Sequence, residues 1–94
     1  MAEEIQEFPS VLVVEDDPSI RSTIAESLGA SGFTVTEAAT AAEARERLAG
    51  FAFDTLVVDL RLPDGDGMQV LEEAIHRYSE LRAVVISGVA GVDE

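Results

Sequence analysis

Apolar residues form three short continuous runs and one alternating segment along the chain, and between these segments they recur at helical spacing. Residues 11–14, 55–58 and 83–86 are continuous runs rich in β-branched side chains, a pattern typical of strands covered on both faces of a parallel sheet. Residues 33–37 instead alternate apolar and polar side chains, which predicts a strand with one exposed face nearer the sheet edge. The chain therefore contains four predicted strands.

A helix is predicted after each of the first three strands. Asp17 is the expected N-cap of the first helix, with Pro18 at its first position and Gly32 after its end. Thr40 begins a capping-box spacing before the second helix, which Gly50 ends. The apolar positions of the three helices are, in chain order, Ile20, Ile24 and Leu28, then Ala41, Ala44 and Leu48, then Met68, Leu71, Ala74, Ile75 and Tyr78.

Alternating strands and helices predict an α/β fold, in which right-handed crossovers join the strands of a parallel sheet. The 94 residues suffice for one domain, and a domain of this size buries a modest fraction of its unfolded surface. We expect this domain to span residues 10–94, after an acidic N-terminal tail at residues 1–9.

Composition narrows the possible functions. The chain lacks cysteine, which excludes disulfides and thiolate metal sites. It also lacks a membrane-length apolar run, so we expect a soluble, cytoplasmic protein without membrane contact. Its formal net charge is −13, and none of its basic residues is a lysine. A field of that sign repels nucleic acid, so we expect no nucleic-acid partner for this chain.

Polar residues follow three of the strands directly. Glu15 and Asp16 come after the first strand, Asp59 after the third and Ser87 after the fourth. Ligands of open α/β sheets bind outside the carboxyl ends of the strands. If the first and third strands are neighbours, the three carboxylates converge, and Mg²⁺ would relieve their repulsion. Asp59 could then act as a nucleophile toward a phosphoryl group, with Ser87 as a hydrogen-bond donor to a phosphoryl oxygen.

Three segments of the chain resemble the receiver domain of two-component response regulators. They are VLVVEDDPSIR at residues 11–21, VDLRLPDGDG at residues 58–67 and VVISG at residues 84–88. The resemblance implies a flavodoxin-like, doubly wound parallel sheet of order 2-1-3-4. The full receiver fold would add a fourth helix, a fifth strand and a fifth helix, so we expect a truncated receiver that lacks these elements.

The resemblance also assigns roles to individual residues. Glu15 and Asp16 correspond to the acidic pair that binds Mg²⁺, and Asp59 to the phosphoacceptor. Arg61 corresponds to the residue whose backbone carbonyl is a metal ligand, and Ser87 to the switch hydroxyl. Two departures matter: Glu15 stands where the family usually has Asp, and the family's lysine at the end of the fifth strand has no counterpart.

The resemblance implies that a sensor histidine kinase or a histidine phosphotransfer protein donates a phosphoryl group to Asp59. The receiver itself would catalyse this transfer and the later dephosphorylation. The alternative is a phosphorylation-incompetent truncated receiver that serves as an interaction or dimerisation module. A haloacid-dehalogenase-type phosphatase is disfavoured, because Arg61 stands where that family needs a second Asp. The sheet edge left open by the missing strand predicts a homodimer.

Several other residues have simpler interpretations. His76 and Arg21 are predicted to be solvated surface charges, and Met68 to be a core residue. Asp64 and Asp66 are each followed by a glycine, which superficially resembles a calcium loop, but a bidentate acid is missing downstream. A turn is the better interpretation of these two acids.

Overall fold

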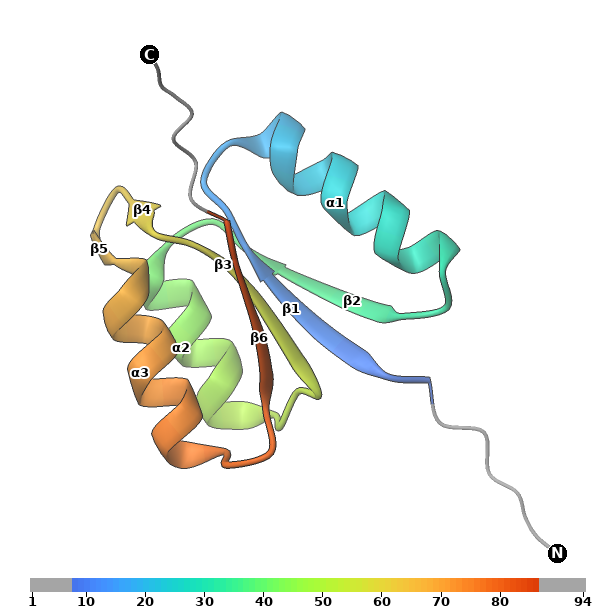
Figure 1. Cartoon of the computed structure of the whole chain (residues 1–94). Coiled ribbons are helices and arrows are strands. Elements are labelled where there is room, and N and C mark those ends of the chain that lie inside the picture. The colour runs from blue at the N-terminus through green and yellow to red at the C-terminus, as the bar shows by residue number, and fades with distance from the viewer. Residues whose placement is uncertain (1–7, 87–94) are drawn as a thin grey trace, which may run out of the picture.

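A parallel sheet of four strands organises residues 8–86, the part of the chain that the computed structural model describes (Figure 1). Its strands are β1 (Ser10–Val14), β2 (Thr34–Ala38), β3 (Thr55–Asp59) and β6 (Arg82–Ile86). The strand order is β2-β1-β3-β6 and every pairing is parallel. Numbered by these four strands alone, this is the predicted order 2-1-3-4, and the prediction of an α/β fold is confirmed.

Helices cover both faces of the sheet. Helix α1 (Pro18–Ala30) lies on one face, whereas α2 (Ala41–Gly50) and α3 (Gly67–Arg77) lie side by side on the other (Figure 1). Each helix connects two parallel strands, as a crossover in an α/β sheet requires. In the described part of the chain, no helix has the length and apolar character needed to cross a membrane.

The helix boundaries follow local signals in the sequence. The Asp17 carboxylate accepts from two backbone N–H groups in the first turn of α1, and Gly32, after its end, has a positive φ of 99°, which suits glycine. Thr40 Oγ1 accepts from the Glu43 backbone N–H at 3.0 Å. The return bond of the predicted capping box is shifted by one residue, because Glu43 Oε1 accepts from Ala39 N at 2.8 Å.

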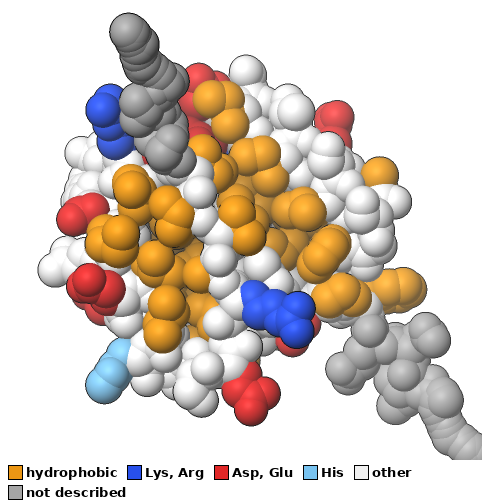
Figure 2. Space-filling view, in the orientation of Figure 1, with side chains coloured by type: hydrophobic (Ala, Val, Ile, Leu, Met, Phe, Trp, Pro, Cys, Tyr) orange, Lys and Arg blue, Asp and Glu red, His pale blue; other side chains and the backbone are white. Residues whose placement is uncertain are grey.

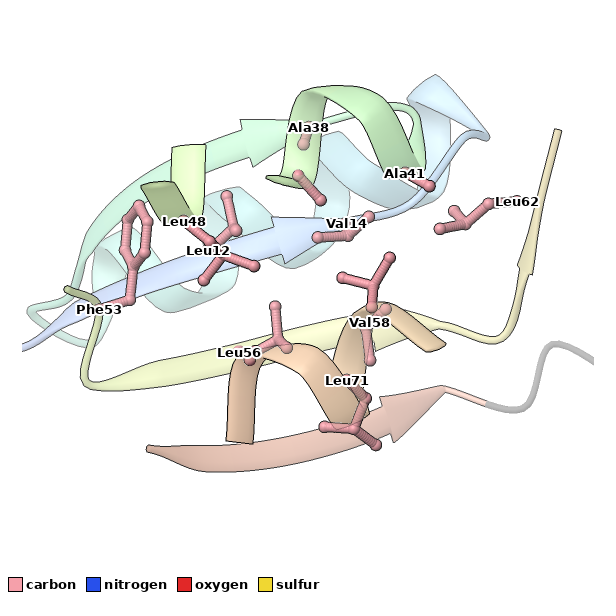
Figure 3. Close-up of a cluster of buried hydrophobic side chains, with 13 residues drawn as sticks. Leu12, Val14, Ala38, Ala41, Leu48, Phe53, Leu56, Val58, Leu62 and Leu71 are labelled. Carbon is pink, nitrogen blue, oxygen red and sulfur yellow. The ribbon is translucent and has the colours of Figure 1, made fainter. Parts of the chain in front are cut away.

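Two apolar clusters, one on each face, hold the layers together. The smaller cluster is centred on Val11, Val13 and Val57 and is covered by α1. The larger one fills the space between the sheet and helices α2 and α3 (Figure 3). Its buried members are Leu12, Val14, Ala38, Ala41, Ala44, Leu48, Phe53, Leu56, Val58, Leu62, Val70, Leu71 and Ala74.

The predicted apolar face of α3 is right at Leu71 and Ala74, which are buried, and at Tyr78, which packs against the larger cluster, but wrong at Met68 and Ile75, which are exposed. The buried residues of α3 are Gly67, Val70, Leu71 and Ala74, which follow the i, i+3, i+4, i+7 pattern of one helix face. Met68 lies one position beyond Gly67, which turns it about 100° away from this face. Its side chain is 39% exposed, so the prediction that Met68 belongs to the core was wrong.

A short hairpin follows β3. Strands β4 (Arg61–Leu62) and β5 (Gly65–Asp66) pair antiparallel across a turn at residues 63–64. The turn agrees with the Pro/Gly-rich sequence, whereas these two strands were not predicted. The hairpin connects the end of β3 to α3, and its Leu62 side chain is buried in the larger cluster.

Gly67 allows the hairpin to return to the end of β3. A Cβ atom at this position would lie 2.0 Å from the Asp59 carbonyl oxygen and 2.8 Å from Leu60 Cα. Both obstacles are backbone atoms, so a larger side chain cannot be accommodated by a rotamer change. We expect Gly67→Ala to lower the free energy of unfolding by about 1–3 kcal/mol, the usual cost of overpacking.

Urea unfolding followed by circular dichroism measures this change. Gly50→Ala is the matched control, because a Cβ at Gly50 would meet no atom within 4 Å. That substitution should leave stability unchanged or raise it by up to about 1 kcal/mol. Equal effects of the two substitutions would show that the close approach at Gly67 is unimportant.

Candidate functional site

Three carboxylates meet where β1 and β3 end. The two strands pair without a stagger, with Val14 opposite Val58, so the residues that follow leave the sheet at the same edge. One carboxylate oxygen each from Glu15, Asp16 and Asp59 lie within 4.8 Å of one another. The structure thus brings together the three acids that the sequence places at strand ends.

Two of these acids are buried. The exposed fraction is 3% for Glu15 and 5% for Asp59, whereas Asp16 is exposed. No ion pair between described residues includes Glu15 or Asp59. Burying a charged carboxylate without a cationic partner is costly. The arrangement therefore favours either protonation or a bound cation.

Backbone N–H groups fix the direction of both buried carboxylates. Glu15 Oε2 accepts from Asp17 N at 3.0 Å, and Asp59 Oδ1 accepts from Arg61 N at 3.1 Å. Each contact joins a carboxylate to the backbone two residues further along the chain. The first residues of each loop therefore position the acid that precedes them.

Arg21 is a part of the site that the sequence analysis missed. Its Nη1 donates to the Glu15 carbonyl oxygen at 2.9 Å, and its Nε donates to Glu37 Oε1 at 3.1 Å. Its side chain is 21% exposed, so the prediction of a solvated surface charge was wrong. A usable signal was its place in the first turn of the helix that follows the acidic pair.

The pKa of Glu15 is raised from 4.5 to about 7. Burial is the largest cause, because it disfavours the charged form. The negative charge of Asp59 and side-chain hydrogen bonds with Asp16 and Asp59 raise the pKa further, whereas the Asp17 N–H lowers it. Repulsion between acids is thus already relieved in part by a proton, which a cation could replace.

The donor set fits a hard divalent cation. It consists of carboxylate oxygens, two of them buried and without an ion-pair partner in the described residues, and Mg²⁺ prefers such oxygen ligands. Arg61 begins β4 next to the cluster, and the role of its backbone carbonyl stays a prediction. Ser87 lies outside the described residues. His76 is exposed on α3, as expected.

Sequence comparison connects the chain to a family of signalling domains. The family model described as "Response regulator receiver domain" matches residues 11–94. The response regulator protein PilR of Pseudomonas aeruginosa is 33% identical over 82 residues, which are 87% of this chain and 18% of that protein. The chain thus spans less than a fifth of this curated relative.

Solved structures give the same picture. A CheY-like response regulator receiver domain protein from Methanospirillum hungatei has a TM-score of 0.85 and 28% identity, covering 92% of this chain and 69% of that one. The Thermotoga maritima response regulator TrrA, crystallised in complex with Mg²⁺–BeF, has a TM-score of 0.77 and 25% identity, covering 82% and 67%.

The raised pKa of Glu15 predicts a pH-dependent stability. Between about pH 4.5 and pH 7, the folded state holds a proton that the unfolded state has released. Raising the pH through this window should therefore lower the free energy of unfolding of the metal-free chain by roughly 1–3 kcal/mol. Urea unfolding at several pH values, with a chelator present, measures this dependence.

Glu15→Gln is the control for this experiment, because it retains a polar side chain and removes the titration. Asp64 and Glu73 have a lowered pKa, so the stability that they contribute is lost only as the pH falls below this window, and they do not mask the effect. If the wild-type and Glu15→Gln chains lose stability in parallel between pH 4.5 and pH 7, the assignment to Glu15 is wrong.

Proposed function

Because the chain belongs to the response regulator receiver domain family of two-component signalling, we propose that it accepts a phosphoryl group on Asp59. The observation that carries this proposal is the convergence of Glu15, Asp16 and Asp59 at one sheet edge. Buried acids that form no ion pair among the described residues suit a site that binds a divalent cation together with an anionic phosphoryl group. The alternative, an interaction module that cannot be phosphorylated, leaves this convergence unexplained.

The proposed reaction is a direct transfer to the carboxylate. An Asp59 oxygen attacks the phosphorus of a phosphohistidine on a sensor histidine kinase or a histidine phosphotransfer protein. A P–O bond forms, the P–N bond breaks and the released imidazole takes a proton from water. In the later hydrolysis, water attacks the phosphorus, inorganic phosphate leaves and the Asp59 carboxylate is restored.

Other residues would hold and orient the reacting groups. We assign Asp16, Asp59 and the Arg61 carbonyl, with Glu15 through water, to hold Mg²⁺, which would offset the charge of the phosphoryl oxygens. The Ser87 hydroxyl would donate to a phosphoryl oxygen. Arg21 would keep the Glu15 backbone in place through its contact with the Glu15 carbonyl.

Phosphorylation of the isolated chain tests the proposal. Incubation with Mg²⁺ and acetyl phosphate should produce a phosphoryl adduct that intact-mass measurement detects. Asp59→Asn should abolish the adduct, because an amide oxygen is a far weaker nucleophile than a carboxylate. Asp54→Asn, at the opposite end of β3, is the matched control and should still be phosphorylated. Failure of the wild-type chain, shown to be folded by circular dichroism, would contradict the proposal.

We also propose that two copies of the chain associate along β6. In the described residues β6 pairs with β3 alone, and Val84 and Val85 are 53% and 41% exposed. Figure 2 shows hydrophobic side chains spread across the face on which β6 lies. An exposed apolar edge strand is a template for strand pairing. Antiparallel pairing about Val84 would keep the two Arg82 side chains at opposite ends of the joined strands.

Sedimentation velocity from low to high micromolar concentration tests this association. The wild-type chain should shift from monomer to dimer as its concentration rises. Val84→Glu should abolish the dimer, because two like charges would then face each other across the pair. Phe8→Glu adds the same charge at a residue that is 64% exposed outside the strands, and should leave the dimer intact. A wild-type monomer at high micromolar concentration would overturn the proposal.

A further inference from the structure

Asp64, at the tip of the hairpin after β3, contacts the N-terminus of helix α2. Its Oδ1 accepts from Ala41 N at 2.7 Å and its Oδ2 accepts from Ala42 N at 3.0 Å. These are the first two residues of α2, whose N–H groups have no partner within their own helix. The two backbone contacts also lower the pKa of the Asp64 carboxyl. One side chain thus caps a helix that begins more than twenty residues earlier.

Helix α2, which Asp64 caps, is held in place by the apolar core. Ala41, Ala44 and Leu48 of α2 are buried in the larger apolar cluster. A Cβ atom at Gly65 would lie 3.3 Å from the Ala41 Cβ, so the hairpin also packs closely on the start of α2. The tip of the hairpin is therefore held to a part of the molecule that is fixed by the core.

The base of the same hairpin is tied to the proposed phosphoacceptor. The Arg61 N–H donates to Asp59 Oδ1 at 3.1 Å. The Gly67 N–H donates to the Leu60 carbonyl at 3.1 Å, and Gly67 approaches the Asp59 backbone closely. Movement of the hairpin tip away from α2 would therefore change the position of Arg61 and of the carboxylate that it orients.

We infer that Asp64 is a positioning residue for the site: by fixing the hairpin against α2, it holds the Arg61 backbone and the Asp59 carboxylate in the arrangement needed for a divalent cation. The inference rests on the proposed function for its effect on cation binding. The mechanical coupling between Asp64 and the Asp59–Arg61 contact is independent of that function.

Asp54 provides a matched control for a merely stabilising aspartate. It is exposed, precedes β3 and accepts from Ser10 N at 2.8 Å and Ser10 Oγ at 3.3 Å. Like Asp64, it joins two segments distant in sequence through hydrogen bonds to its carboxylate. It lies at the end of the sheet opposite to the three acids, so its loss should affect stability without affecting the site.

Calorimetric titration with Mg²⁺ provides the first measurement. Asp64→Ala should raise the dissociation constant for Mg²⁺ by about tenfold. This is the lower end of the loss of metal affinity caused by removing a residue that orients a metal ligand without binding the metal itself. Asp54→Ala should leave it unchanged. Asp64→Asn removes the charge but keeps an oxygen acceptor, and should restore most of the affinity. Equal affinities of Asp64→Ala and wild type would overturn the inference, as would Asp64→Asn binding as weakly as Asp64→Ala.

Amide hydrogen exchange in the metal-free chain provides the second measurement. The Arg61 and Gly67 amides should exchange faster in Asp64→Ala than in wild type, and at the wild-type rate in Asp54→Ala. Unchanged exchange at both amides would overturn the inference. A wild-type chain that binds no Mg²⁺ would contradict the proposed function. In that case the exchange rates of the Arg61 and Gly67 amides alone would test whether Asp64 positions the hairpin. If Asp64→Ala does not fold, Asp64→Asn with partly accelerated exchange takes its place.

Discussion

The unstaggered parallel pairing of β1 with β3 is the constraint on which the rest of the structure depends. Val14 lies opposite Val58, and the alternation of side chains along each strand then determines where Glu15 and Asp59 point. Leu12, Val14, Leu56 and Val58 face α2 and α3, so Glu15 and Asp59 turn toward the side of α1. A slip of one residue would exchange the two faces of a strand. The apolar core thus selects the register that makes the acidic site.

That register has an energetic cost at the end of the sheet. The buried charged residues in the described part of the chain are Glu15 and Asp59, the two acids that the pairing brings together. Hydrogen bonds from backbone N–H groups to both carboxylates, and protonation of Glu15, whose pKa is raised to about 7, reduce this cost without removing it. The remaining repulsion opposes folding and, for the same electrostatic reason, favours a cation at this edge of the sheet.

The sequence predicted what local signals determine. Continuous apolar runs identified three strands of the sheet and an alternating segment identified the fourth. Asp17 and Gly32 marked the ends of α1 because capping and a positive φ are local requirements. Contacts between distant segments could not be predicted. Asp64 reached α2 because a hairpin of two short strands brought it there. In α3 the prediction was wrong at Met68 and Ile75, because packing on the sheet, and not apolar content alone, determines which face is buried.

The two faces of the sheet differ in how firmly their helices are attached, and this difference affects motion. Helix α1 contains no buried residue, and its packing relies on partly buried side chains such as Ile24 and Leu28. Helices α2 and α3 each bury several residues in the larger cluster. Segments with few buried contacts open at a lower free energy than the core. We therefore expect helix α1 to open at a lower free energy than α2 and α3, and such opening would detach Arg21 from Glu15 while the contacts between the hairpin and Asp59 stay in place.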